Sequence, residues 1–409
     1  GERPVPHSRE WFESIQSSGR RGWRMYEKMG SPTKIVAPMV DQSELAYRLL
    51  CRRHGAQLCY TPMINSKILV DDPTYRRSNL DIDCPYDRPL IVQLCGNDPS
   101  TMAKAGSFVE DHCDAVDINL GCPQNIARRG KYGAFLLDEW DLLQDVVWEM
   151  HTLLKVPVTC KIRLLSNVED TIVLCRLLVA AGCCMITVHG RTKSQIGSVA
   201  GESNWKAIEM IRRALPIPVF ANGGISSLND FNLCIEKTGV AGVMVSEAIL
   251  CSPAFFIPKC SFELKKHGIS ALVNEYFEIV KSYPPKRYAG GTIRGHMFKI
   301  LYLCLFQCED LRPKLADAQS AENIKKVCDE IVQRNGKCID QYPQIAWYFR
   351  HRKHFIDLSI HSDMFGFSKP KPTVDQSTNP CLKHWKKSIE PSVHDNIALA
   401  TMFGSFEEE

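Results

Sequence analysis

Three patterns are missing from this chain of 409 residues, and each absence argues against a class of protein. No two cysteines stand in a C-x-x-C arrangement, which argues against a zinc ribbon or a thioredoxin-type redox site. No run of about 18 apolar residues occurs, so we expect no transmembrane helix and no membrane partner. The segment before residue 31 lacks an apolar core and contains several Glu, which makes it a poor secretory signal and a weak transit-peptide candidate.

A disulfide scaffold is also not expected, although the chain contains 18 cysteines, because such scaffolds are typical of short secreted chains. We expect buried free thiols in a reducing compartment, the cytoplasm and/or the nucleus. The formal net charge of +4 and a hydrophobic content of 44% are ordinary for a globular protein. We expect a monomer without a metal site.

Eight short apolar segments alternate with helical patterns and predict βαβ units. Each has the near-continuous apolar character of a parallel strand that is buried on both faces. The strands are expected at 35–39, 58–63, 90–94, 115–120, 158–162, 185–188, 219–221 and 242–245, and helices at 43–54, 141–155, 168–181, 205–214 and 228–237. Eight such units favour a (β/α)₈ TIM barrel of the α/β class, although periodicity alone does not exclude a doubly wound sheet.

The pattern changes after residue 258 and predicts a second domain. Apolar residues then recur with a helical period over 264–280, 292–307 and 321–332. We divide the chain into an N-terminal extension (1–33), a catalytic barrel (34–258), a small C-terminal helical domain (259–358) and a polar, weakly ordered tail (359–409).

Polar residues gather at the ends of the predicted strands, where barrel enzymes carry their active groups. Buried polar groups are costly when unpaired, so this set predicts a polar ligand at the barrel mouth. The polar strand-end residues are Gln93, Asn119, Lys161, Arg163, His189, Arg191 and Asn222, and the strand ends also carry Pro38, Met39, Val40, Gly223 and Gly224.

Lys161 interrupts an apolar strand, and a buried ammonium needs an anion or a polarised carbonyl. The electron-rich edge of a reduced flavin would suit it, although a structural ion pair is the alternative. His189 is either a flavin ligand or a histidine satisfied by a neighbour. The turn Asn222-Gly223-Gly224 is either a phosphate cradle or a plain tight turn.

Cys122 follows a strand end in the loop Gly121-Cys122-Pro123, which directs it toward the site. A thiol with an ordinary pKa of about 8.5 is mostly protonated at neutral pH and can act as a general acid. Its position, and not its identity among the 18 cysteines, distinguishes it.

The segment from Asp117 to Gln124 (DINLGCPQ), followed by GKYGAFL at 130–136, closely resembles the signature of tRNA-dihydrouridine synthases. Further similar segments follow in the family's order, and together they cover about residues 34–258. They are APMV at 37–40, CKIR at 160–163, HGRTK at 189–193, NGGI at 222–225 and, in the helical part, RGHMFK at 294–299. Segments 41–46 and 54–63 also resemble the eukaryotic branch that acts on positions 16 and 17 of the tRNA D-loop.

The resemblance implies bound FMN, with NADPH or NADH as the reductant, and reduction of uracil in tRNA. In that chemistry hydride passes from the reduced flavin to uracil C6, and the matching thiol, Cys122, protonates C5 as the catalytic residue. The implied flavin contacts are Pro38, Met39, Val40, Gln93, Lys161, His189, Asn222, Gly223, Gly224, Ser246 and Glu247. The chain departs from the family at Ser246-Glu247, where many members have Gly-Arg, so the flavin phosphate would have to rely on backbone N–H groups and Ser246.

The tRNA is expected to bind a basic region of the chain. Residues 281–355 contain twice as many Lys and Arg as Asp and Glu, and basic groups neutralise phosphates, although a charge run is often only a solvated helix face. We predict tRNA contacts at Asn119, Arg163, Arg191, Arg294, Lys299, Lys325, Lys326, Arg350 and Arg352.

Two alternatives stay open at this point. A flavin oxidoreductase acting on a free small molecule would share the barrel but would not need the basic helical domain. A non-catalytic RNA-binding relative would keep the barrel without flavin, and the Ser246-Glu247 departure makes this conceivable.

Overall fold

The structure is a computed structural model, and it describes residues 3–258 and 268–335. Two compact units divide the chain, one of residues 1–249 and 253–258 and the other of residues 250–252 and 259–409. The predicted tail, 359–409, lies outside the described residues.

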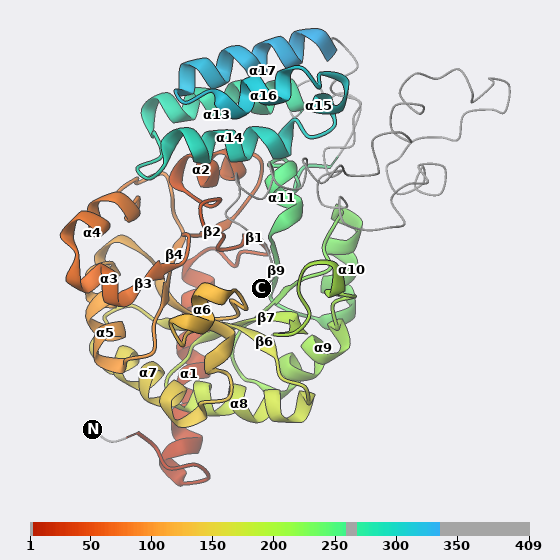
Figure 1. Cartoon of the computed structure of the whole chain (residues 1–409). Coiled ribbons are helices and arrows are strands. Elements are labelled where there is room, and N and C mark those ends of the chain that lie inside the picture. The colour runs from red at the N-terminus through yellow and green to blue at the C-terminus, as the bar shows by residue number, and fades with distance from the viewer. Residues whose placement is uncertain (1–2, 259–267, 336–409) are drawn as a thin grey trace, which may run out of the picture. The chain divides into compact units, whose positions relative to one another are not determined.

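The first unit contains a closed barrel of eight parallel strands, so the predicted fold class is confirmed (Figure 1). Its strands are β1 (Lys34–Val36), β2 (Leu58–Tyr60), β4 (Leu90–Cys95), β5 (Ala115–Leu120), β6 (Val158–Leu164), β7 (Met185–Thr192), β8 (Val219–Asn222) and β9 (Gly242–Val245). The barrel closes where β1 pairs with β9 and where β2 pairs with β4. A ninth strand, β3 (Ile64–Asn65), pairs with β4 after the chain has left β2.

The barrel strands are almost entirely buried, which explains their continuous apolar character. All six residues of β4 and all six of β5 are buried. Buried polar side chains also occur on these strands, among them Gln93, Asp117 and Thr159, and the sequence there is constrained by hydrogen bonding as well as by packing.

Helices alternate with the strands around the barrel, and all five predicted helices are present within about two residues of their expected ends. They are α2 (Leu45–Arg53), α7 (Trp140–Leu153), α8 (Val168–Ala180), α9 (Trp205–Ala214) and α10 (Leu228–Thr238). Helix α10 begins with a capping box between Ser227 and Asp230 and ends at Gly239, whose φ of 62° is left-handed.

Several short helices were not predicted, because runs of three to nine residues carry little periodicity. They are α3 (Ser66–Asp71), α4 (Pro73–Asn79), α5 (Pro99–Ser107), η1 (Glu110–His112), α6 (Asn125–Arg129), η2 (Gly133–Leu136), η3 (Gly197–Val199) and α11 (Glu247–Cys251). Helices α3 and α4 lie with β3 in the long connection from β2 to β4, and α6 and η2 follow Cys122.

Within the N-terminal extension, residues Arg9–Lys28 form the 20-residue helix α1. Met25 and Tyr26 join the core cluster with residues of the barrel strands, and the Tyr26 hydroxyl donates to the Ala241 carbonyl at 2.9 Å. A Cβ at Gly22 would lie 2.1 Å from the Cys184 carbonyl, so only glycine permits this close approach. Helix α1 therefore belongs to the barrel's core.

The second unit is helical in its described part. Its helices are α13 (Ile269–Ser282), α14 (Ala289–Ile300), α15 (Cys304–Gln307), α16 (Leu311–Asp317) and α17 (Ala321–Asn335). Their core includes Tyr276, Met297 and Ile331. Among the described residues of both units, no helix is long and apolar enough to cross a membrane.

Candidate active site

A pocket of about 230 Å³ opens at the carboxyl ends of the barrel strands, as the strand-end residues predict. Its lining is strongly polar and combines a thiol, two cations, an imidazole and three amides. The lining residues are Pro38, Val40, Met63, Gln93, Asn119, Gly121, Cys122, Gln124, Lys161, Arg163 and His189. The structure thus brings together eight of the residues predicted for the site.

Cys122 is held in the pocket by its own loop. The Asn119 side-chain oxygen accepts from the backbone N–H of Gly121 at 3.1 Å and of Cys122 at 2.9 Å. The Cys122 thiol lies 3.8 Å from the Gln124 side-chain oxygen, to which it can donate. Among the cysteines that the structure describes, the other fourteen are buried and Cys122 alone is partly exposed. Burial raises the pKa of the Cys122 thiol, and this effect outweighs the cations Lys161 and Arg163, so the thiol keeps its proton at neutral pH.

Lys161 presents an ammonium group that needs a partner. Burial, reinforced by the nearby charge of Arg163, lowers the pKa of Lys161 to about 8. Within the described parts of the chain no hydrogen bond or salt bridge reaches its Nζ, although the buried carboxylate of Asp117 on the neighbouring strand attracts its charge. An electron-rich group bound in the pocket would supply the missing acceptor.

His189 is a neutral imidazole in this site. Burial lowers its pKa well below 6.5, and the charges of Lys161, Arg163 and Arg191 lower it further. Its Nε2 lies 3.3 Å from Nη1 of Arg191, and because a guanidinium only donates, Nε2 must accept. The proton of the neutral ring therefore lies on Nδ1.

Two arginines that were predicted to contact the substrate donate hydrogen bonds to backbone carbonyls instead. Arg163 is buried and donates to Gly121 at 2.8 Å, and to Thr192 and Gln195, so it ties the Cys122 loop to the end of β7. It still lines the pocket, and its substrate contact stays a prediction. Arg191 is buried, does not line the pocket and donates twice to the Gly201 carbonyl, so its placement does not support a substrate contact.

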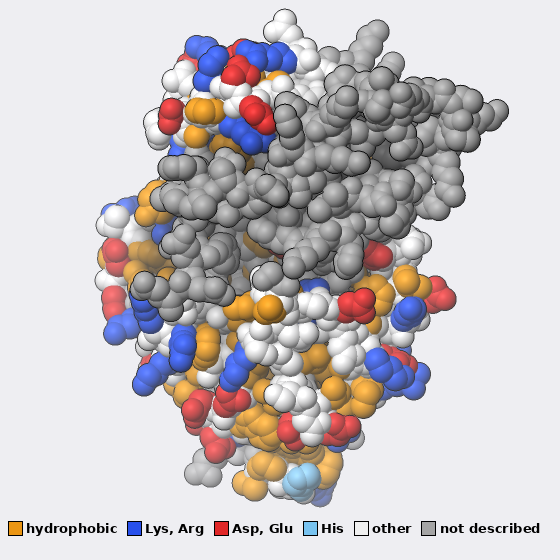
Figure 2. Space-filling view, turned by 45° about the vertical axis from the view of Figure 1, so that its right-hand side comes forward, with side chains coloured by type: hydrophobic (Ala, Val, Ile, Leu, Met, Phe, Trp, Pro, Cys, Tyr) orange, Lys and Arg blue, Asp and Glu red, His pale blue; other side chains and the backbone are white. Residues whose placement is uncertain are grey.

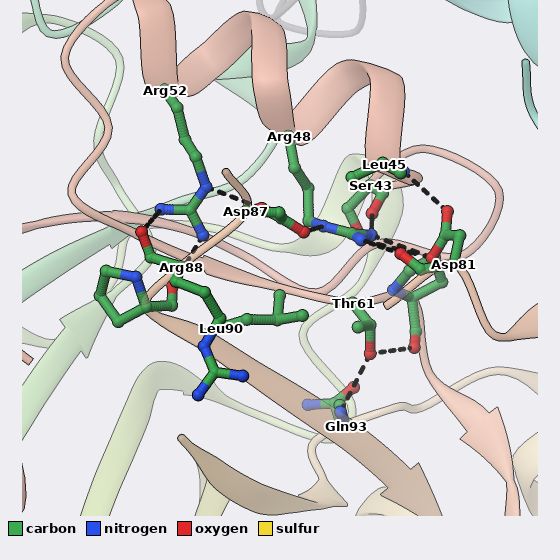
Figure 3. A network of polar contacts seen from close by, with 12 residues as sticks. Ser43, Leu45, Arg48, Arg52, Thr61, Asp81, Asp87, Arg88, Leu90 and Gln93 are labelled. Carbon is green, nitrogen blue, oxygen red and sulfur yellow. Dashed lines mark hydrogen bonds and ion pairs between the residues drawn. The ribbon is translucent and has the colours of Figure 1, made fainter. Parts of the chain in front are cut away.

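Pro38 and Val40 belong to the loop after β1, and a buried charged network lies just beyond this loop in the chain, around Ser43 and Arg48 (Figure 3). The guanidinium of Arg48, fully buried on α2, donates to Asp87 at 2.8 Å, to the Ser43 carbonyl at 2.6 Å and to the Asp81 carbonyl at 2.8 Å. The Ser43 hydroxyl in turn contacts both the N–H and the carbonyl of Met39, at 3.0 and 3.1 Å.

Asp87 is the carboxylate that the two arginines of this network stabilise, whereas burial raises the pKa of Asp81 despite the charge of Arg48. Burial favours the protonated carboxyl of Asp87, but Arg48 and Arg52 outweigh burial and lower its pKa. Arg52 donates to the second Asp87 oxygen at 2.7 Å. The network thereby fixes the loop after β1 against residues 80–89. Met39 itself packs toward the barrel core and does not line the pocket, so its flavin contact stays a prediction.

The turn after β8 has a defined geometry that requires glycine, but it does not line the pocket. Gly223 and Gly224 have left-handed φ angles of 99° and 77°, and a Cβ at Gly223 would lie 2.7 Å from the His189 ring. Asn222 donates to the Met244 carbonyl at 2.9 Å and to the Ser246 hydroxyl at 3.1 Å. Their predicted phosphate contacts, like that of the exposed Glu247, stay predictions.

Comparison with known proteins agrees with this geometry. The sequence profile described as Dihydrouridine synthase (Dus) matches residues 35–338. The chain belongs to the dihydrouridine synthase family. It is 46% identical over 331 residues to a tRNA-dihydrouridine(16/17) synthase-like protein of Rattus norvegicus, covering 78% of this chain and 73% of that protein.

Other members of the dihydrouridine synthase family are also similar to it. The tRNA-dihydrouridine(16/17) synthase of Saccharomyces cerevisiae is 40% identical over 339 residues, which cover 80% of this chain and 79% of that protein. A tRNA-dihydrouridine(20a/20b) synthase-like protein of Mus musculus is 38% identical over 230 residues, which cover 56% of this chain and 70% of that protein. The resemblance inferred from the sequence motifs is therefore confirmed.

The cations predicted to bind tRNA in the helical unit of this dihydrouridine synthase have different surroundings. Lys299 is buried and its Nζ donates to the Gly295 carbonyl at 2.8 Å, so its placement does not support the predicted tRNA contact. Arg294 is half-buried and donates to the Ala318 carbonyl at 2.6 Å. Lys325 pairs with Asp329, and Lys326 with Glu322 at 2.9 Å.

Figure 2 shows Lys and Arg beside Asp and Glu on the visible described part of these helices, and not a patch of one sign. Lys326 is well exposed, so its contact with tRNA stays a prediction, as do those of Arg294 and Lys325. Arg350 and Arg352 lie outside the described residues. No cluster of His, Cys, Asp or Glu within the described ranges could hold a metal ion.

The predicted site lacks four residues of the dihydrouridine synthase site. Met63, Gly121 and Gln124 line the pocket, and all three lie in or just after predicted strand ends, which is the signal that could have found them. Asp117 does not line the pocket, but it is fully buried behind it and hydrogen-bonds to Gln93 at 2.9 Å. An aspartate inside an apolar strand was the available signal.

Proposed function

We propose that this protein reduces uridine to 5,6-dihydrouridine in tRNA, with FMN as the bound cofactor and NADPH or NADH as the reductant. The names of its relatives give the reaction, the tRNA substrate and NAD(P)(+). The observation that carries the proposal is the pairing of a protonated thiol with an unpartnered lysine in one polar pocket.

The residues present fit a flavin. The free ammonium of Lys161 would meet the electron-rich edge of the ring, where negative charge develops on reduction. Gln93 and Asn119 would hydrogen-bond the polar edge, and Pro38 and Val40 would cover a face. A flavin bound here supplies the hydride that uracil C6 receives.

Cys122 would supply the proton that uracil C5 receives. Burial keeps the proton on its sulfur, and a general acid must hold its proton until the transition state. Arg163 and Asn119 hold the loop that carries this thiol from opposite sides, the first through the Gly121 carbonyl and the second through the N–H groups. The sulfur is thereby fixed relative to the pocket.

We propose positions 16 and 17 of the D-loop as the target uridines. The support is a higher identity over a longer part of the chain with relatives named for 16/17 than with those named for 20a/20b. A base must leave its stack to enter a pocket at a barrel mouth, and D-loop bases are single-stranded, which lowers that cost.

The deciding experiment is mass-spectrometric mapping of dihydrouridine in tRNA from cells that lack this protein. Dihydrouridine should disappear from positions 16 and 17 and return when the wild-type gene is restored. A gene encoding Cys122→Ala is the matched control and should not restore it. Loss at position 20 alone would contradict the site assignment, and no loss anywhere would contradict the function.

In a purified system, Cys122→Ala should slow uridine reduction by about 10²–10⁴-fold, the usual scale for a lost general acid. Flavin content and tRNA affinity should stay at the wild-type level, because the thiol is not needed for either. Absorbance of the bound flavin and a binding titration check both. Full activity of this variant would remove Cys122 from the mechanism.

A further inference from the structure

A chain of buried hydrogen bonds runs from the middle of β5 to the Cys122 loop. One oxygen of Asp117 accepts from Nε2 of Gln93 at 2.9 Å. Oε1 of Gln93 accepts from Nδ2 of Asn119 at 2.8 Å, and Oδ1 of Asn119 accepts from the backbone N–H groups of Gly121 and Cys122. We call Asp117, Gln93 and Asn119 the amide relay.

The strands place these residues side by side. Gln93 on β4 is in register with Asp117 on β5, which is in register with Thr159 on β6. Asn119 lies two residues after Asp117 and therefore points to the same face of the sheet. The Thr159 hydroxyl donates to the other Asp117 oxygen at 2.6 Å, so both carboxylate oxygens accept hydrogen bonds.

The carboxylate determines the direction of the relay. An ionised carboxylate only accepts, so the Gln93 amide must turn its NH₂ group toward Asp117 and its oxygen toward Asn119. Asn119 must then donate to Gln93, which leaves its own oxygen for the N–H groups of Gly121 and Cys122. A neutral amide at position 117 would allow either direction.

We propose that Asp117 is a positioning residue for Cys122, because its carboxylate sets the orientation of both amides and thereby holds the N–H groups of the Cys122 loop. The inference rests on the proposed function only in taking Cys122 as the proton donor.

The same orientation of the two amides also determines which hydrogen-bond donors face the pocket. The second N–H of Gln93 and of Asn119 has no acceptor within the described parts of the chain, so both amides offer donors to a ligand.

The cost of the arrangement supports a role beyond packing. Asp117 is fully buried, and burial raises its pKa to about 6, so its charge at neutral pH opposes folding. The hydrogen bonds from Thr159 and Gln93 and the charge of Lys161 only partly offset burial. An asparagine would occupy the same volume without a charge, so this chain carries a carboxylate where a neutral group would fold more readily.

Amide hydrogen exchange tests the inference without flavin or tRNA. In Asp117→Asn, the peptide containing Gly121 and Cys122 should exchange about fivefold faster, the scale of one weakened hydrogen bond. Thr159→Val is the matched control, because it removes an equally buried hydrogen bond to Asp117 but leaves an acceptor for Gln93. Unchanged exchange in Asp117→Asn, or equal acceleration in Thr159→Val, would overturn the inference.

A swap of the two end residues tests the direction itself. Asn119→Asp places carboxylates at both ends of Gln93, whose oxygen must then face one of them, and the urea midpoint of unfolding should fall. Adding Asp117→Asn should restore most of the loss, because the relay then runs in reverse and still offers a carboxylate to the Cys122 loop. Failure of this rescue would refute a directed relay.

Simple repulsion between two carboxylates could also produce a rescue, so the cycle is repeated with Gln93→Met. The rescue should disappear, because methionine cannot relay a hydrogen bond. A rescue that persists would overturn the inference. If the rescue is seen but cells that lack the protein keep their dihydrouridine, the proposed function is contradicted and the relay is not. If those cells lose dihydrouridine but Asp117→Asn does not rescue Asn119→Asp, the relay is contradicted and the proposed function is not.

Discussion

Two buried polar networks support the pocket, and they are built on different chemistry. The charged network of Arg48, Arg52, Asp81 and Asp87 joins a helix to loops, with guanidinium groups that reach backbone carbonyls. The amide relay joins two neighbouring strands, β4 and β5, and contains a single charge, on Asp117. The first network pairs opposite charges, whereas in the second one carboxylate sets the orientation of two neighbouring side-chain amides.

The comparison teaches what each chemistry is suited to. Buried charged side chains can fix loops that have no hydrogen bonds to a sheet, because one guanidinium donates to several carbonyls and carboxylates at once. Arg48 does so with Asp87, Ser43 and Asp81. Amides on adjacent strands are already held by the barrel and need only be oriented. We therefore expect the charged network to matter mainly for stability and the relay mainly for the pocket.

The largest effect should come from the charged network. Arg48→Met leaves Asp87 and Asp81 without their main buried partner and should lower the free energy of unfolding by about 3–5 kcal/mol. Urea denaturation measures it. Arg48→Lys is the control, because it keeps the charge but cannot reproduce the forked contacts. A loss below about 1 kcal/mol in Arg48→Met would mean that the loops are held by other contacts.

The second effect concerns the pH dependence of stability. The folded pKa of Asp117, about 6, lies above its unfolded value, so the protonated form is favoured by folding. Relative to Asp117→Asn, the wild type should lose about 3 kcal/mol of stability as the pH rises from about 4 to above 6. Lys161, Tyr60 and Cys160 are the titratable neighbours, and both proteins share them. A constant difference between the two proteins over this range would contradict the assignment.

A smaller effect should follow from Ser43, which links the charged network to the pocket wall. Ser43→Ala removes the hydroxyl that contacts both the N–H and the carbonyl of Met39, and it should cost about 1–2 kcal/mol. Thermal unfolding measures the loss. Ser43→Thr keeps the hydroxyl and is the control. If the alanine and threonine variants unfold alike, the hydroxyl does not transmit the network to Met39.

The smallest effect should come from a surface pair, which has neither burial nor a network. Lys326→Ala removes the pair with Glu322 on α17 and should leave the unfolding midpoint unchanged within error. If Lys326 contacts a tRNA phosphate, the slope of log Kd against log salt should become shallower by about one. An unchanged slope would exclude this residue from the tRNA contact.

The sequence sufficed for the barrel because its strands are buried on both faces and therefore read as continuous apolar runs. Cys122, Lys161 and Gln93 were identifiable because polar residues at strand ends interrupt that pattern, and the structure brings all three to one pocket. These signals are local, since each depends on a residue and its immediate neighbours.

What the sequence could not show depends on contacts between distant segments. Lys299 has the same charge as an exposed lysine, and only the packing of α14 reveals that it is buried. Arg191 was expected to reach the substrate, but the loop after β7 supplies a carbonyl that occupies it. The relay likewise requires the register of β4 with β5, which no periodicity predicts.

The helix formed by residues Arg9–Lys28 has a practical consequence for anyone who works with fragments of this chain. The match to the family profile begins at residue 35, which invites a cut just before it. Such a cut would strip Met25 and Tyr26 from the base of the barrel and expose the apolar surface that they cover. A recombinant version trimmed at that boundary should aggregate, whereas one that starts ahead of residue 9 should stay dispersed.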